Sequence, residues 1–139
     1  MARHAYACPM RWSDMDAYGH VNNVVFLRYL EEARIDLLLT AAGPRGRAML
    51  DDGIVVVRHE IDYRRPLVHR KEPIPVVTWV DEIKNSSFTV AYVIAERVDD
   101  EELVYVEART VLVLIDLETG RPRRVGPDDQ AWLERFLDD

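Results

Sequence analysis

The sequence RWSDMDAYGHVNNVVFLRYLEEARIDLLL (residues 11–39) joins a crowded polar loop to a long apolar pattern. After the loop, apolar residues recur every three or four positions, which predicts a helix over residues 22–42 with most of its surface buried. At about 1.5 Å per residue this helix would be roughly 30 Å long. The sequence GPRG (residues 43–46) is expected to end it, because glycine adopts left-handed caps and proline cannot continue a helix.

The apolar period then changes to two, which is typical of strands. Strands are predicted over residues 53–66, 73–84, 86–98 and 102–116, and the turn-like stretches KNSS and VDDEE favour consecutive antiparallel hairpins. A first strand is expected within residues 4–12 and a short closing helix at 128–137. Residues 1–139 therefore predict a single α+β domain, in which one long central helix is wrapped by a curved antiparallel sheet of about five strands.

Composition excludes several classes of protein. The net charge of -7 argues against a nucleic-acid partner. No uncharged apolar run of about 18 residues is present, so no membrane span is expected, and residues 1–12 lack the pattern of a secretory signal. The four histidines show no metal-site spacing, so we expect no metal. The single Cys8 can form no internal disulfide, which suits a cytoplasmic protein. Apolar residues on both sheet faces predict a homodimer or homotetramer.

The polar loop also carries a family resemblance. SDMDAYGHVNNVVFLRYLEEAR resembles the signature of the hotdog-fold thioesterases of the 4-hydroxybenzoyl-coenzyme A thioesterase type, and its HVNN portion is similar to related acyl-coenzyme A and acyl-carrier-protein thioesterases. IDYRRPL (residues 61–67) is similar to a second element of the family. The resemblance covers residues 6–114. It implies hydrolysis of an acyl thioester of coenzyme A or a carrier protein, with no cofactor beyond the coenzyme of the substrate, in a site shared by two subunits.

Residue by residue, the resemblance places the catalytic aspartate at Asp16. It places the oxyanion donor at the backbone N–H of Asn23, seven residues later. The two matching motifs supply the substrate-binding candidates, to which a hairpin serine is added: Gly19, His20, Val21, Asn22, Tyr63, Arg64, Arg65 and Ser87.

Elementary chemistry supports these roles. The first N–H groups of a helix have no partner within it and carry partial positive charge, so they suit the oxygen of a carbonyl under attack. Asp16 could attack the carbonyl directly or remove a proton from water, and the residues do not choose between the two. Gly19 allows a sharp turn and a close approach of substrate. Asn22 or Asn23 would cap the helix.

Plainer interpretations stay open beside these. Asp14 is interpreted as a turn or salt-bridge residue rather than a second catalytic acid. His20 is interpreted as a loop residue or as a group that adjusts Asp16. His59 and Trp12, Trp79 and Phe88 read as core or interface, although one of the aromatic residues could line an acyl tunnel. Cys8 reads as buried filler, and Ser86 and Ser87 as turn residues or coenzyme contacts.

The stretch from Arg58 to Lys71 holds five basic residues against two acidic ones, which is either a solvated strand end or a site for coenzyme phosphates. Two other functions are weighed beside hydrolysis. A hotdog hydratase or dehydratase usually needs a histidine paired with an acid, and no such pair is visible inside the helix. A non-catalytic acyl-coenzyme A binding module would not need Asp16.

Overall fold

The structure, a computed structural model, describes residues 2–138; residues 1 and 139 of the expected domain lie outside the described part. Its elements run along the chain as β1 (His4–Cys8), a 3-10 turn (Trp12–Asp14), α1 (Asn23–Asp36), a π-helical turn (Leu37–Ala41), α2 (Pro44–Asp52), β2 (Ile54–Tyr63), β3 (Ile74–Ile83), β4 (Ser87–Val98), β5 (Glu101–Leu114) and α3 (Pro127–Arg135).

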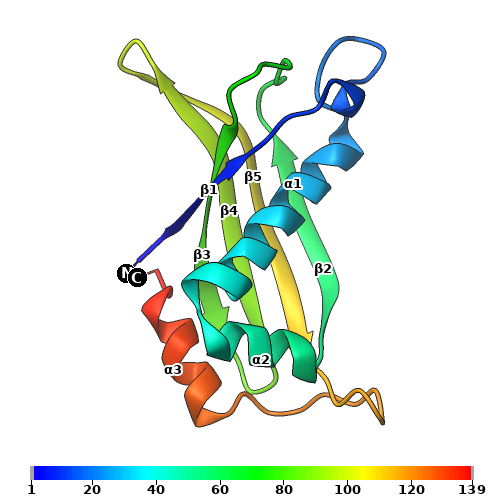
Figure 1. The fold of residues 1–139 in the computed structure, drawn as a ribbon, viewed down its shortest axis with the longest axis vertical. Coiled ribbons are helices and arrows are strands. Elements are labelled where there is room, and N and C mark those ends of the chain that lie inside the picture. Colours follow the sequence, from blue (N-terminus) through cyan, green and yellow to red (C-terminus); the bar gives the residue numbers. More distant parts are fainter. Residues whose placement is uncertain (1, 139) are drawn as a thin grey trace.

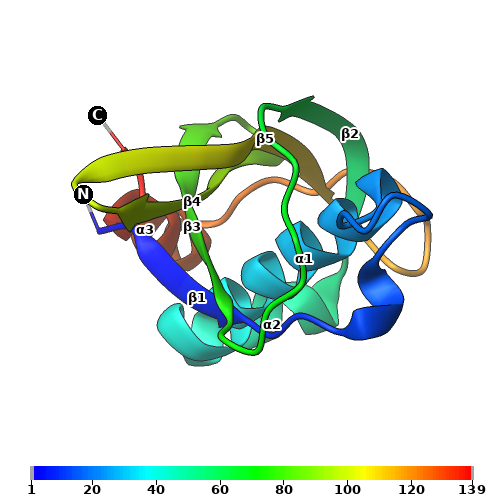
Figure 2. The same cartoon turned by 90° about the horizontal axis from the view of Figure 1, so that it is seen from above.

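The five strands form one antiparallel sheet in the order β1-β3-β4-β5-β2. Strands β3, β4 and β5 are consecutive hairpins, as the turn residues predict. Strand β2 instead crosses to the far edge and pairs with β5. Helix α1 lies along one face of the sheet, and seen from above the strands curve around it (Figures 1 and 2). The predicted α+β architecture of a sheet against a central helix is therefore present.

Helix α1 begins where the asparagine pair predicts a cap. The side chain of Asn22 accepts a hydrogen bond from the Val24 N–H at 3.1 Å. The expected single helix over 22–42 is only partly present, because the α-helix ends at Asp36 and its last turn is π-helical over Leu37–Ala41. The apolar stripe holds: Phe26, Leu30, Ala33 and Leu37 are all buried.

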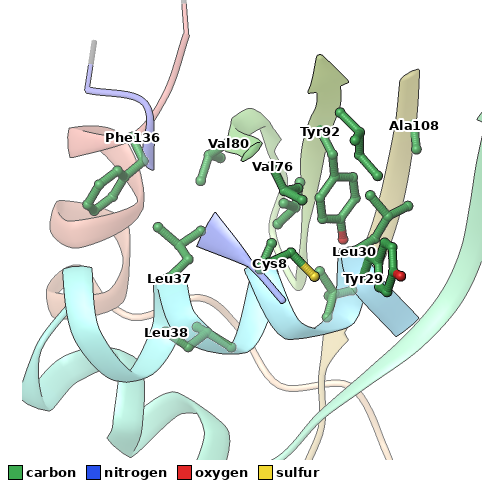
Figure 3. Close-up of a cluster of buried hydrophobic side chains, with 14 of the residues drawn as sticks. Cys8, Tyr29, Leu30, Leu37, Leu38, Val76, Val80, Tyr92, Ala108 and Phe136 are labelled. Atoms are coloured by element: carbon green, nitrogen blue, oxygen red, sulfur yellow. The ribbon is translucent and has the colours of Figure 1, made fainter. Parts of the chain in front are cut away.

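The core lies between α1 and the inner face of the sheet. Figure 3 shows Leu30 and Leu37 of the helical segment among side chains of β3 and β4. Val76, Val80 and Ile94 are fully buried there. Burying such side chains contributes about 1.5–3 kcal/mol each, so this layer fixes the position of α1 against the sheet.

Strand β2 departs from the expected alternation. A bulge between Val56 and Arg58 shifts the register, so Val56 shares the inner face with His59 rather than opposing it. A strict period of two along residues 53–66 predicts Val55 and Val57 on the same face as His59, Ile61 and Tyr63, and the bulge shows that this prediction is wrong. His59 is an exposed residue whose Nδ1 lies 2.9 Å from the Thr110 hydroxyl, at the edge of the sheet rather than in the core.

Two further helices complete the fold. Helix α3 occupies the place of the predicted closing helix, and its Trp132 and Leu133 are buried. Helix α2 was not expected, because GPRG was interpreted only as a helix end. Gly43 does end the first helical segment at a φ of 67°, but Pro44 is the first residue of the next helix.

Candidate functional site

The polar loop before α1 folds back on itself as a small hairpin. Met15 and Val21 form an isolated antiparallel bridge, and the Asp16 N–H donates to the His20 carbonyl at 2.7 Å. Gly19 turns the chain with a φ of 77°, a conformation that side chains disfavour. The Val21 N–H donates to the Leu67 carbonyl at 2.8 Å, which ties the loop to the segment after β2. The loop is thus held on both sides at one end of α1 (Figure 1).

The carboxyl group of Asp16 is fixed by the loop it belongs to. One oxygen, Oδ1, accepts the backbone N–H groups of Tyr18 at 2.8 Å and His20 at 3.1 Å. These bonds, first that from His20 and then that from Tyr18, hold the pKa of Asp16 below its ordinary value of 3.8. Asp16 is therefore a carboxylate at neutral pH, and its Oδ2 makes no hydrogen bond with residues 2–138.

The N–H groups at the start of α1 are unequally satisfied. That of Asn22 donates to the Asp14 carbonyl at 2.9 Å, that of Val24 to the Asn22 side chain, and that of Val25 to the Asn22 carbonyl at 2.9 Å. The Asn23 N–H, by contrast, has no acceptor among the residues that the structure describes. The helix start therefore presents one unpaired donor at the position where an oxyanion donor is predicted.

Asp16 and Asn23 line the same hollow, which has a volume of about 300 Å³. Tyr63 comes to it from the end of β2, where its hydroxyl donates to the Asn23 carbonyl at 3.0 Å. The structure brings together seven of the predicted site residues here: Asp16, His20, Val21, Asn23, Tyr63, Arg64 and Arg65. Gly19 and Asp16 also line a neighbouring hollow of about 500 Å³, so Asp16 stands on the wall between the two.

Not every predicted residue lies at this place. Asn22 caps the helix instead of lining the hollow. Ser87 begins β4 at the β3–β4 hairpin and faces Val113 of β5, whereas Tyr63 faces Val106. Seven residues of strand separate those positions, roughly 23 Å at ~3.3 Å per residue. The structure therefore does not bring Ser87 to Asp16 within one chain.

The basic stretch is largely neutralised by the chain itself. Three of its arginines have acidic partners: Arg58 with Glu60, Arg64 with Glu107 at 3.1 Å, and Arg70 with Glu96 at 2.5 Å. Arg65 has no acidic partner within residues 2–138, and it lines both the hollow of Asp16 and an adjoining one of about 360 Å³. An exposed, unpaired guanidinium beside the carboxylate is the part of the stretch most suited to an anion.

Asp14 is the residue whose importance the sequence understated. It was expected in a turn or salt bridge, and it does pair with Arg28 at 2.5 Å, but it is also completely buried. Burial alone would raise its pKa, yet the hydrogen bonds from Arg28, Tyr29 and the Arg11 N–H outweigh burial and lower it to about 2. A D-x-D spacing does not predict a buried carboxylate, because Arg28 is fourteen residues away in the sequence and contacts Asp14 only in the folded chain.

Three other candidate residues, Trp12, Phe88 and Cys8, do not line the hollow shared by Asp16 and Asn23. Trp12 is 78% exposed and lines the hollow that adjoins that of Asp16, so it lies outside the core, and its interpretation as an interface residue stays a prediction. Phe88 is buried. Burial raises the pKa of the Cys8 thiol to about 11, which suits filler and not a nucleophile. Among the described residues, no group of three or more His, Cys, Asp and Glu side chains is arranged to hold a metal ion, and no helix is long and apolar enough to cross a membrane.

The sequence matches known proteins over most of its length. The family model of the thioesterase-like superfamily matches residues 10–133. The chain is 32% identical over 128 residues to the long-chain acyl-CoA thioesterase FadM of Escherichia coli (strain K12), covering 92% of this chain and 95% of FadM.

Solved structures are similar along nearly the whole chain. A thioesterase from Thermus thermophilus complexed with coenzyme A and Zn is 27% identical with a TM-score of 0.74, over 96% of this chain and 92% of that one. A mutant 4-hydroxybenzoyl-CoA thioesterase complexed with 4-hydroxybenzoyl-CoA shares the fold with a TM-score of 0.80 at 14% identity, over 94% of this chain and 98% of that one. The resemblance that the polar loop carries is therefore confirmed, and the chain belongs to the thioesterase-like superfamily.

Proposed function

We propose that this protein hydrolyses acyl thioesters of coenzyme A to a free acid and a thiol. One observation carries the proposal: the ionised Asp16 and the unpaired N–H of Asn23 line a single hollow at the start of α1. Its relatives include a long-chain acyl-CoA thioesterase and a thioesterase complexed with coenzyme A, which favours an acyl-CoA substrate.

The Asn23 N–H is proposed as the oxyanion donor. A thioester carbonyl gains negative charge on oxygen as a nucleophile adds to its carbon, and a donor already aimed at that position needs no reorganisation. Helix α1 adds partial positive charge at its N-terminus. The Tyr63 hydroxyl donates to the Asn23 carbonyl, which belongs to the following peptide, between Asn23 and Val24, and holds that peptide from the side of β2.

Asp16 is proposed as the group that starts the attack. As a base it would take a proton from water while the water oxygen adds to the carbonyl carbon, and the C–S bond then breaks to release the thiol. As a nucleophile it would form a mixed anhydride and release the thiol first, and water would then hydrolyse the anhydride. Both routes need the ionised form that the amides of His20 and Tyr18 favour.

The experiment that tests the function offers the purified protein a panel of acyl-CoA esters, one of them an enoyl ester, and follows free thiol. Thiol release from at least one ester supports hydrolysis. Water addition to the enoyl ester with the thioester intact would show a hydratase instead. Tight binding without release would show a binding module. If an acyl-carrier-protein thioester is cleaved faster than every acyl-CoA ester, the proposed carrier of the acyl group becomes the carrier protein instead of coenzyme A.

Arg65 is proposed to bind the coenzyme phosphates. We expect Arg65→Gln to raise KM for an acyl-CoA about three- to tenfold with little change in kcat, since a surface charge pair contributes up to about 1 kcal/mol. The same acyl group on pantetheine, which lacks the nucleotide phosphates, should show no such difference. Arg47→Gln in α2 serves as the control, because Arg47 is a similarly exposed arginine outside the hollow. An unchanged KM for the Arg65 variant would remove this residue from the coenzyme site.

The chain is also proposed to form a homodimer through β2. This strand pairs on one side only, with β5, and its edge carries Val55, Val56 and Val57 with exposures of 39%, 40% and 57%. Antiparallel self-pairing about a two-fold axis at His59 would place Arg58 opposite Glu60 of the partner subunit, twice. The exposed edge and this charge complementarity favour a second copy of the chain as the occupant.

Charge reversal tests this register. Arg58→Glu or Glu60→Arg alone places like charges opposite each other, and we expect either to weaken the dimer about tenfold in Kd. The double exchange restores opposite charges and should restore the Kd of the parent. Sedimentation equilibrium measures all four proteins. A monomeric parent would refute the dimer, and single variants with the affinity of the parent would refute the two-fold axis at His59.

A cytoplasmic location remains a prediction that accompanies the proposed substrate. The single Cys8 can form no internal disulfide, which suits a reducing compartment. Finding the protein in an oxidising compartment of its cell would contradict the predicted cytoplasmic location.

A further inference from the structure

Asp14, two residues before Asp16, occupies the most enclosed position of the loop. Its side chain is completely buried and accepts four hydrogen bonds. They come from the Arg28 guanidinium at 2.5 Å, the Tyr29 hydroxyl at 2.6 Å, and the Arg11 N–H and Nε at 2.9 and 3.3 Å. A buried carboxylate with this many donors is held in one place, since breaking any charged contact leaves a desolvated charge.

The same residue closes the loop through its backbone. The Asp14 carbonyl accepts the N–H of Asn22, the cap of α1, at 2.9 Å. One residue further inward, Met15 and Val21 form their bridge. Asp14 therefore stands where the two arms of the loop meet, one leading to Asp16 and the other to Asn23.

Arg28 and Tyr29 belong to α1, the helix whose first N–H is the proposed oxyanion donor. The Asp14 side chain thus connects the body of α1 to the arm that carries Asp16, while its carbonyl connects that arm to the helix start. No other side chain within residues 2–138 joins the loop to the body of α1 by a charged contact.

We propose that Asp14 is a positioning residue, which clamps the Asp16 loop onto Arg28 and Tyr29 and thereby sets the distance from the attacking carboxyl to the oxyanion donor. This inference rests on the proposed hydrolase function. Asp14 itself does not touch substrate, because its side chain is sealed from the hollow. Its effect is expected in kcat, since displacing reacting groups by about 1 Å can cost about a hundredfold in rate.

The test is Asp14→Asn beside Asp129→Asn. Asp129, in α3, is also a buried carboxylate, 3% exposed, and it lies outside the hollow. It pairs with Arg45 of α2 at 2.7 Å. Both variants lose a buried charge pair, so both are expected to be less stable. Only Asp14→Asn should lower kcat per folded enzyme, by about 10- to 100-fold, with KM within about threefold of the parent. Equal kcat in the two variants would overturn the positioning role.

Tyr29→Phe is the second variant, for the case in which Asp14→Asn does not fold. It removes one donor but keeps the Arg28 contact, so it should lower kcat by about three- to tenfold at unchanged KM. If Asp14→Asn is unfolded and Tyr29→Phe has the same kcat as the parent protein, the proposal is also overturned.

Amide hydrogen exchange separates this inference from the proposed function. If the parent cleaves no thioester, the function fails, but the clamp can still be measured. Exchange of the amides in residues 15–22 should rise at least tenfold in Asp14→Asn, or in Tyr29→Phe if the former is unfolded, and stay at the parent level in Asp129→Asn. Unchanged exchange in this loop would refute the clamp whatever the activity of the parent.

Discussion

Asp16→Asn is expected to lower kcat on the best acyl-CoA ester about a thousandfold while KM changes little. An amide can neither accept a proton from water nor attack a carbonyl at a useful rate, and such groups typically contribute 10²- to 10⁴-fold. The substitution preserves the loop, since the amide oxygen of asparagine can still accept the N–H groups of Tyr18 and His20. The loss therefore reports chemistry rather than folding.

Asp116→Asn is a matched control for this variant. Asp116 also uses its Oδ1 to accept two backbone N–H groups of its own turn, those of Glu118 at 2.8 Å and Thr119 at 3.1 Å. It lies outside the hollow of Asp16. Thiol release should equal that of the parent for Asp116→Asn. If Asp16→Asn retained more than about a tenth of the parent kcat, Asp16 would be a binding or turn residue.

The pH profile of the parent gives an independent view of the same carboxyl. If Asp16 starts the attack as proposed, activity needs its ionised form and should fall only as pH drops through the folded pKa of Asp16. That pKa lies below 3.8, because the His20 and Tyr18 amides stabilise the carboxylate. Initial rates of thiol release should therefore be flat from about pH 5 to 8. An acidic limb within that range would mean that a group other than Asp16 controls the rate.

Local patterns predicted the elements of this fold better than their ends. The stripe through Phe26, Leu30 and Ala33 depends on one period and one buried face, and the structure has that helix. The bulge in β2 has no such signature, because Val55, Val56 and Val57 are equally apolar and any of them could face inward. A run of identical residue types leaves the strand register to pairing with β5.

The candidate site divides in a similar way. Asp16 and Asn23 belong to one loop and one helix start, so seven positions of sequence suffice to bring them to one hollow. Tyr63 and Arg65 reach it because β2 ends beside α1. The family resemblance named them as substrate-binding candidates but did not give this placement. Ser87 depends on which end of the sheet the β3–β4 hairpin occupies, and the hairpin lies at the end opposite the loop (Figure 1). Distances of that kind follow from topology, not from residue type.

Gly46→Ala is expected to have the largest effect on stability. A glycine inside GPRG suggested a helix end, but Gly46 lies within α2 and is buried against the preceding helical turn. A Cβ added there would lie 2.1 Å from the Leu38 carbonyl oxygen and 2.7 Å from the Ala42 Cβ. Both are groups without a rotatable end, so α2 itself must move by about 1 Å. Overpacking of this kind costs about 3 kcal/mol.

Thermal unfolding at one fixed protein concentration measures this cost, and a loss of ~3 kcal/mol corresponds to a Tm lower by roughly 10 °C for a domain of this size. Gly126→Ala controls for the change of residue type, because a Cβ at Gly126 meets nothing within 4 Å and its φ of -79° suits alanine. That variant should lose less than about 1 kcal/mol. The helix propensity of alanine favours α2 by about 1 kcal/mol in Gly46→Ala. A Tm above that of the parent would therefore mean that α2 shifts without cost and that the tight approach to Leu38 does not hold it in place.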